Sequence, residues 1–488
     1  MHYSKYLKNL IIIGHTTSNS CKIWIRIADC GNDGVNKEYV LRLAQNGEFT
    51  HEIFFKIDNE NSDNIAVIEA LNLSVNNKYE CWIYDGDHII YGGDPAQEAS
   101  FTTLDAAAKD SNFAVVSCNQ PFTYNKKGVK SIEAKAWDQL KEQNPDFIIH
   151  LGDQIYSDAT KKHNNIYLEA KNGSNLLECY RNFYKANWAI EQINSVLSNF
   201  PNYMTLDDHD IFDGYGSYTN EEKEKYAKDK IKKDVGVFDD IFSAAKKSYL
   251  EYQHSHNPDT LEGVFDYPLS NQNGDFYFFD LRMNRDINNQ NTKYKILGQD
   301  QHDRFDIWLE EQEKSSSKSP IFIVSGVPFV HLKTIASEIL INFKSLKDDI
   351  RDHWGLDLHK AEFDKILEQL FDLGQKTKRP IIILSGDVHM SAIFDISSNK
   401  HPNIKLHQIT SSAITNTNPF FLRHAMKIFS AKKGKLSGNK NYSYQQITNY
   451  THKNFATINT KFDKDQNLSD VIVKIFSENG EVRKIDLL

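Results

Sequence analysis

The sequence predicts a mixed α/β protein in which an N-terminal β-sandwich precedes a larger unit built around a parallel sheet. In the first hundred residues, apolar and polar residues alternate over several short segments separated by Gly, Asn and Asp, which is typical of a β-sandwich. From residue 112 onward, short apolar strands alternate with helical segments, the pattern of right-handed βαβ units. We therefore expect two domains, 1–104 and 112–488.

The N-terminal strands are recognised by their period of two. In SCKIWIRIAD (20–29), Cys21, Ile23, Ile25 and Ile27 form one face, while Trp24 and Arg26 lie on the other. Residues 105–111, DAAAKDS, are expected to form the linker to the second domain.

The second domain is expected to begin with a strand at 112–118, a helix over 128–146 that Pro145 ends, and a strand at 147–153. The apolar stripe of this helix is formed by Ile132, Ala136, Trp137 and Leu140. The charged segment 220–256 should be helical with a solvated face. Near the C-terminus, Asn479-Gly480 predicts a hairpin between two antiparallel strands. The remaining strands are predicted at 275–282, 319–328, 379–389 and 404–413, with helices at 299–314 and 361–378.

Composition excludes several classes of protein. The net charge of −9 and the pI of about 6.1 argue against a nucleic-acid-binding surface. Five cysteines without a C-x-x-C pair argue against a disulfide scaffold, and no apolar run reaches the roughly 20 residues of a membrane span. Because no signal peptide or twin-arginine pair is evident, we expect a cytoplasmic protein. The sequence gives no indication of its oligomeric state.

Four predicted strands end in residues that can do chemistry. They deliver Cys118, then Asp153 with Tyr156, then the run Asp207 to Asp210, and finally Asp387 with His389. Each group alone has an ordinary interpretation as a turn, a helix cap or a packing residue. In open α/β sheets, however, ligands bind beyond the carboxyl ends of the strands. Four such endings in one chain therefore indicate a shared site.

Carboxylates brought together in this way repel one another unless a cation lies between them. The ligand types divide into two sets, with Asp153 expected to bridge them. Cys118, Asp153, Tyr156 and His389 form a soft, electron-donating set suited to iron, with Tyr156 bound as phenolate. Asp153, Asp208 and Asp387 offer hard oxygens suited to Ca²⁺ or Mg²⁺. His209 is then expected to act as a catalytic acid, with Asp210 orienting its imidazole.

The motifs SCNQ (117–120), GDQIY (152–156), DDHD (207–210) and SGDVH (385–389) resemble, in this order, those of the PhoD-like alkaline phosphatases among the calcineurin-like metallophosphoesterases. The resemblance implies a four-layer αββα sandwich over 112–488. It also implies a centre holding Fe³⁺ and Ca²⁺ or other divalent ions, which hydrolyses phosphate esters through a metal-activated hydroxide. The chain departs from the commoner Asp-x-His start of the superfamily, so the first metal set depends on the PhoD-like variant.

Two residues are candidates for substrate binding, Asn119 and Arg282. Asn119 could donate to a phosphate oxygen or simply form a turn. Arg282, with Arg285, could clamp phosphate or brace the fold through ion pairs. The leading function is a phosphoesterase, and the alternatives are a phosphodiesterase with phospholipase-D-like activity and a non-catalytic binding protein on the same fold.

Overall fold

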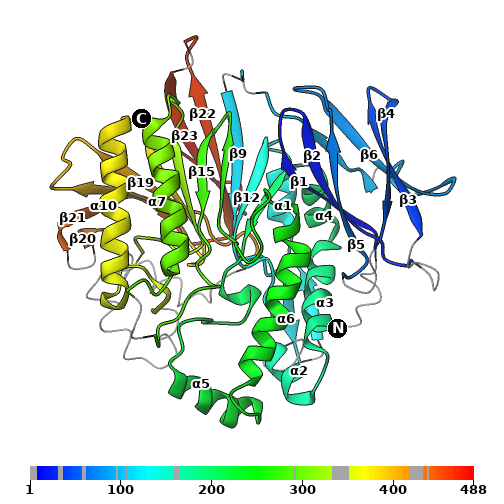
Figure 1. The fold of residues 1–488 in the computed structure, drawn as a ribbon, viewed down its shortest axis with the longest axis horizontal. Coiled ribbons are helices and arrows are strands. Elements are labelled where there is room, and N and C mark those ends of the chain that lie inside the picture. The colour runs from blue at the N-terminus through cyan, green and yellow to red at the C-terminus, as the bar shows by residue number, and fades with distance from the viewer. Residues whose placement is uncertain are drawn as a thin grey trace.

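Two central β-sheets pack face to face, and helices cover both outer faces (Figure 1). This is the four-layer αββα arrangement expected from the sequence, and additional sheets lie on its N-terminal side. The structure is a computed structural model that describes residues 8–30, 37–57, 62–94, 97–105, 107–108, 110–126, 128–158, 165–289, 293–331, 351–416, 432–436, 439–465 and 467–488.

The first central sheet has six strands in the order β13-β12-β9-β22-β23-β24. β9, β12 and β13 are parallel, whereas the three C-terminal strands pair antiparallel. The predicted strand at 147–153 is β12, and all five of its residues are buried because both faces of the sheet are covered. The strands are β9 (Asp110–Val116), β12 (Phe147–Leu151), β13 (Asn202–Thr205), β22 (Asn454–Phe462), β23 (Leu468–Ser477) and β24 (Val482–Asp486).

The second central sheet has eight strands in the order β14-β15-β16-β17-β19-β18-β21-β20. β15, β16, β17 and β19 are parallel, so their carboxyl ends meet at one edge. The strands are β14 (Tyr267–Asn271), β15 (Gly274–Phe278), β16 (Ile321–Ser325), β17 (Ile381–Ser385), β18 (Ser391–Ser398), β19 (Lys405–Thr410), β20 (Lys433–Leu436) and β21 (Asn439–Tyr450).

Amphipathic helices complete the outer layers. α7 and α10 pack their apolar stripes on the eight-stranded sheet and lie side by side in Figure 1. A larger group of helices covers the six-stranded sheet, and α5 projects beyond the strand ends. The helices are α1 (Lys135–Lys141), α2 (Ile166–Asn172), α3 (Leu176–Trp188), α4 (Glu191–Leu197), α5 (Asn220–Tyr226), α6 (Val237–Tyr252), α7 (Gly298–Lys314) and α10 (Lys360–Thr377). Among the described helices, none is both long enough and apolar enough to cross a bilayer.

One predicted helix is much shorter than expected. The segment 128–146 begins as strand β11 (Gly128–Ile132), which pairs with β10 (Phe122–Asn125), and only then becomes α1. Ile132, expected on the apolar stripe of the helix, is 45% exposed on the strand. Pairing with β10 therefore determines the conformation of the first part of the segment, despite its helical pattern. The second part is helical as predicted, with Ala136, Trp137 and Leu140 buried.

The N-terminal region folds as two small antiparallel sheets around a common core. Cys21, Ile23, Ile25 and Ile27 face this core, as their alternation predicted. β8 ends eight residues before β9 begins, so the predicted boundary between 104 and 112 remains our proposal for dividing the chain. The strands are β1 (Leu10–Thr16), β2 (Ser20–Arg26), β5 (Ile65–Leu71), then β3 (Glu38–Gln45), β4 (Glu48–Lys56), β6 (Lys78–Asp85), β7 (His88–Tyr91) and β8 (Ser100–Thr102).

The opposite face of β2 packs on the helices of the larger unit. The Trp24 ring lies 5.8 Å from that of Trp188, and its indole Nε1 donates to the carbonyl of Glu251 at 2.8 Å. Arg26 pairs with Asp63 at 3.1 Å, and Asp63 also lies 3.1 Å from the Lys185 ammonium. A carboxylate of the N-terminal region thus neutralises cations on both sides of the contact.

We expect Asp63→Asn to weaken the fold by about 2–4 kcal/mol at pH 7, because it leaves Arg26 and Lys185 partly unneutralised in a buried contact. Burial raises the pKa of Asp63. The positive charges of Arg26 and Lys185 act in the opposite direction and bring this pKa below its ordinary value of 3.8. The stabilisation is therefore present above pH 3.8 and is lost as the pH falls through the folded-state value.

Urea unfolding followed by tryptophan fluorescence measures this difference, since Trp24 and Trp188 report on the contact. The control is Glu310→Gln, which removes the exposed pair with Lys314 on α7 and should change the unfolding free energy by less than about 0.5 kcal/mol. Equal effects of the two substitutions would show that the contact does not depend on Asp63.

Candidate metal centre

The parallel strands of both sheets end at the same edge, below the sheets in Figure 1, and the predicted ligands gather there. Within the described residues, ligand atoms of Cys118, Asp153 and His389 lie within 4.8 Å of one another. Three further groups meet the same limit, namely Asp153, Asp208 and His209; Asp207, Asp208 and Asp387; and Asp158, His209 and Asp213. The geometry thus brings together the residues that the sequence analysis singled out.

The first group is compact. The Cys118 sulfur lies 3.3 Å from Asp153 Oδ2, and the Tyr156 hydroxyl lies 3.1 Å from the same oxygen. That hydroxyl is 2.9 Å from His389 Nε2. Ligand atoms that share one ion at about 2.0–2.3 Å lie about 3–3.5 Å from one another. The spacings of these three pairs of donor atoms fit ligands that share a metal ion.

The second group consists of carboxylates. Asp208 belongs to the group with Asp153 and to the group with Asp207 and Asp387, so it connects the two. Its Oδ2 accepts from the Gly214 amide at 2.7 Å, whereas its Oδ1 is buried without a hydrogen bond and lies 3.6 Å from Arg282 Nη2. Asp153 Oδ1 and Asp207 Oδ2 are likewise buried without a partner. Orphaned carboxylate oxygens of this kind fit a hard cation.

The loops that carry the ligands adopt unusual backbone conformations. Cys118, Asp153, Asp387 and His389 all have positive φ, between 49° and 65°. Each such residue costs about 1–2 kcal/mol, so the surrounding packing must hold it in place. Gly152 has φ +92°, and a Cβ there would lie 2.4 Å from the Cβ of Asp207. Only glycine therefore lets the β12 and β13 loops approach this closely.

Burial makes the ionised forms of these ligands unfavourable in the absence of a cation. It raises the pKa of Asp153 well above its usual range, and Asp208 and Asp207 add to the effect. Burial and the neighbouring acids Asp207, Asp208 and Asp153 act in the same direction on Asp387. Burial, then the charge of Asp153, also raises the pKa of the Cys118 thiol and of the Tyr156 phenol. Positive ions at this position would reverse all four effects.

The orienting partner of His209 is Asp158 rather than Asp210, so the prediction for Asp210 is wrong. His209 Nδ1 lies 2.9 Å from Asp158 Oδ1, and its ring stacks on Tyr156 with centroids 4.1 Å apart. Burial lowers the pKa of His209. The negative charges of Asp158, Asp208 and Asp153 act in the opposite direction and raise this pKa overall. Asp158 lies at the end of the stretch GDQIYSD, where a second acid five residues after Asp153 was the available signal.

Asp210 instead fixes the loop that carries Asp153. Its Oδ2 accepts from the Asp153 and Asp207 amides, both at 2.9 Å, and its Oδ1 accepts from the Gln154 and Ile155 amides at 3.0 and 3.3 Å. The Gln253 side chain donates to the same Oδ1 at 3.1 Å. Asp210 therefore ties the loop after β12 to the loop after β13.

Arg282 is fully buried and occupied by carboxylates, which supports the bracing interpretation and not the substrate-binding one. Its guanidinium pairs with Asp207 Oδ1 at 2.5 Å and with Asp352 Oδ1 at 3.0 Å.

Asn119 has one polar atom without a hydrogen-bond partner. Its Oδ1 accepts from the Trp137 indole and from Thr415, so its Nδ2 is left as a buried donor without a partner.

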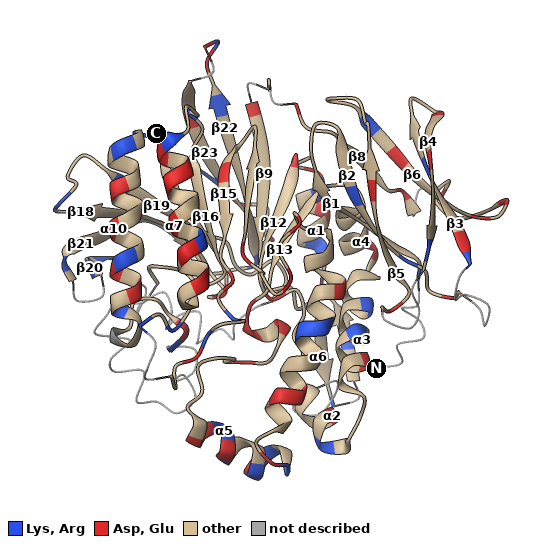
Figure 2. Ribbon diagram, in the orientation of Figure 1, with Lys and Arg blue, Asp and Glu red and all other residues tan. Residues whose placement is uncertain are grey.

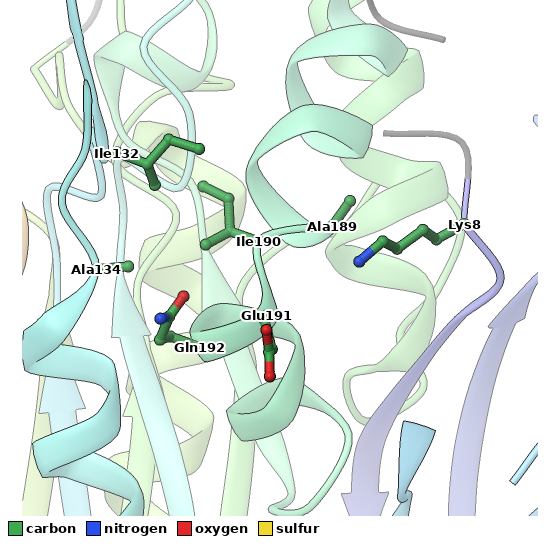
Figure 3. Close-up of a pocket in the computed structure, with 7 residues that line it drawn as sticks. All are labelled: Lys8, Ile132, Ala134, Ala189, Ile190, Glu191 and Gln192. Carbon is green, nitrogen blue, oxygen red and sulfur yellow. The ribbon is translucent and has the colours of Figure 1, made fainter. Parts of the chain in front are cut away.

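Within the described part of the chain, the four groups above are the clusters of His, Cys, Asp and Glu whose ligand atoms lie close enough to hold a metal ion. Figure 2 marks acidic residues in loops below the central strands and both signs on α5. The cavity in Figure 3, of about 310 Å³, shares no residue with the four groups above. It is lined by Lys8, Ile132, Ala134, Ala189, Ile190, Glu191 and Gln192.

Comparison with known proteins identifies the family to which this fold and cluster belong. The PhoD-like phosphatase model matches residues 113–466, so the chain belongs to the PhoD-like phosphatase family. The solved "Structure of PhoD" superposes with a TM-score of 0.65 at 16% identity, covering 98% of this chain and 91% of that one, which supports the shared fold.

One curated relative is the "Uncharacterized protein YGR266W" of Saccharomyces cerevisiae. It is 25% identical over 320 residues, which is 50% of this chain and 44% of that protein. The chain thus matches less than half the length of this relative.

We expect Asp210→Asn to lower the free energy of unfolding by about 2–4 kcal/mol, because an amide nitrogen would face backbone N–H donors in place of a carboxylate oxygen. Asp158→Asn is the matched comparison, since Asp158 accepts from His209 and from the Asp213 amide nearer the surface. Its cost should stay near 1 kcal/mol. Urea unfolding of both variants measures the order, and a larger loss for Asp158→Asn would contradict the assignment.

Proposed function

We propose that the protein hydrolyses phosphate esters at a centre that holds iron on Cys118, Asp153, Tyr156 and His389. Asp208 and Asp387, together with Asp153 or Asp207, would hold calcium or another hard divalent ion. The observation that carries the proposal is the convergence of a thiol, a phenol, an imidazole and a carboxylate within single-ion spacing, next to carboxylates with orphaned oxygens. When bound, the ions polarise the phosphate and lower the pKa of a water molecule.

His209 is the proposed general acid. Asp158 holds its Nδ1, and its Nε2 lies 4.0 Å from Asp213 Oδ1, an acid that is about half exposed. Nε2 is thereby directed toward the more open side of the cluster, where it would deliver its proton to the leaving oxygen. Asp158 acts as a positioning residue, because it fixes the ring and the nitrogen that carries the proton.

Asn119 is the proposed contact to a phosphate oxygen. Trp137 Nε1 can only donate, so its bond to Oδ1 fixes the orientation of the Asn119 amide and leaves Nδ2 as the free donor. An amide held in this way would stabilise charge on a phosphate oxygen without moving during the reaction.

A phosphodiester substrate is the second candidate, and the position of the two arginines favours it. Arg282 and Arg285 are both buried and both pair with Asp352, so part of their charge is already neutralised within the protein and less is left for a monoester. Rates on bis-aryl and mono-aryl phosphates distinguish the candidates. A ratio above one supports the diesterase, including phospholipase-D-like cleavage, and a strong monoester preference excludes it.

A non-catalytic binding protein on the same fold would not need His209, Asp153 and the remaining ligands to converge. We also propose a reducing, cytoplasmic location, which the five free cysteines support.

We expect Asp153→Asn to lose both metal loading and aryl-phosphate turnover, with the rate falling by more than about 100-fold, because this carboxylate joins the two ligand groups. Elemental analysis of the purified protein and initial rates measure the two effects. Asp146→Asn is the control, since Asp146 precedes β12 at the opposite end and bonds the Asn112 amide. Full activity in Asp153→Asn would disprove the catalytic assignment.

A further inference from the structure

The Cys118 thiol receives a hydrogen bond from a serine of a different loop. Ser412 lies two residues beyond β19, is fully buried, and has its Oγ 3.0 Å from the Cys118 sulfur. The same Oγ accepts from the His389 backbone amide at 3.0 Å. One hydroxyl therefore connects two of the proposed iron ligands, which are separated by 271 positions in the chain.

The geometry fixes the direction of the Ser412 proton. A hydroxyl has one proton to donate, and a lone pair of Ser412 is already used by the His389 amide. The proton is thus available to the sulfur. Ser117 Oγ also lies near this sulfur, at 3.4 Å, but it is closer to the Ser411 carbonyl at 3.0 Å, a stronger acceptor than sulfur. Ser412 is therefore the hydroxyl that is committed to Cys118.

The loop that carries Ser412 is anchored from both central sheets. The Asn454 side chain at the start of β22 donates to the Ser412 carbonyl at 2.6 Å, and the Asn454 amide donates to the Ala413 carbonyl at 2.8 Å. Ser391, at the start of β18, in turn donates to Asn454 Oδ1. The Ser411 amide donates to the Ser385 carbonyl at 2.9 Å. Ser412 is consequently held at a fixed position relative to both ligands.

We infer that Ser412 is a positioning residue of the iron side of the centre. Its hydroxyl orients the Cys118 sulfur, withdraws electron density from it, and holds the positive-φ backbone of His389 in place. Hydrogen bonds from such neighbours orient metal ligands, and those to a coordinated sulfur raise the reduction potential of the metal. The inference rests on the proposed function, because it requires iron at Cys118.

The test compares Ser412→Ala with the matched variant Ser411→Ala, whose hydroxyl bonds the Val115 carbonyl at 3.1 Å and not the sulfur. Each full-length protein is loaded with iron, and its affinity is measured by competition with a chelator. We expect Ser412→Ala to bind iron about 10–100-fold more weakly than wild type. Its sulfur-to-iron charge-transfer band should also shift, while Ser411→Ala matches wild type in both properties.

A second measurement needs no destabilising substitution. In wild-type protein and in Ser411→Ala, exchange of the serine hydroxyl into D₂O should shift the iron–sulfur stretching band in resonance Raman spectra. If wild type binds no iron, the proposed iron site fails and this inference fails with it. If wild type binds iron but its band is insensitive to D₂O, or Ser412→Ala equals wild type in affinity and spectrum, only the role of Ser412 is overturned.

Discussion

Repulsion among buried carboxylates is the constraint around which this molecule is organised. Asp153, Asp207, Asp208 and Asp387 meet at one edge of two sheets, and burial disfavours the charged forms of Asp153, Asp207 and Asp387. Arg282 pairs with Asp207 and lies 3.6 Å from Asp208 Oδ1, but one oxygen each of Asp153 and Asp207 remains buried without a partner. A site with more negative than positive charge is expected to bind cations tightly, because the Arg282 guanidinium forms no hydrogen bond with the remaining carboxylate oxygens.

Hydrogen bonds and ion pairs outside the cluster hold the loops that carry these carboxylates in place. Asp210 collects backbone amides of two loops, Arg282 ties Asp207 to Asp352, and Gly152 permits the closest approach. The ligands with positive φ therefore keep their positions without depending on a metal for every contact. Acids of the same type have opposite roles here. Asp210 accepts backbone N–H groups and Asp352 pairs with arginine, whereas Asp153 and Asp207 each keep one buried oxygen without a partner.

Membership of the PhoD-like phosphatase family and the site geometry support each other, although they rest on different observations. The family match covers the chain from β9 to the loop after β22 and includes each of the converging residues. The geometry adds the division of labour within the site. Asp158 bonds the imidazole of His209, the proposed acid, and the Ser412 hydroxyl bonds both Cys118 and His389, two of the proposed ligands.

The sequence by itself determined the type and order of most elements, but not that the helix expected over 128–146 begins as β11. Apolar patterns predicted β12, α7 and α10, and the Asn479-Gly480 turn predicted the C-terminal hairpin. The placement of Cys118, Asp153 and Asp387 beyond parallel strands predicted that they would meet. Only the tertiary structure decided which acid forms a hydrogen bond or ion pair with which histidine, arginine or backbone amide. Asp210 is next to His209 in the chain, yet Asp158 holds the imidazole, and Arg282 is enclosed by acids from two other loops. Hydrogen bonds and ion pairs act over about 3 Å in space, and the distance between residues along a chain does not specify them.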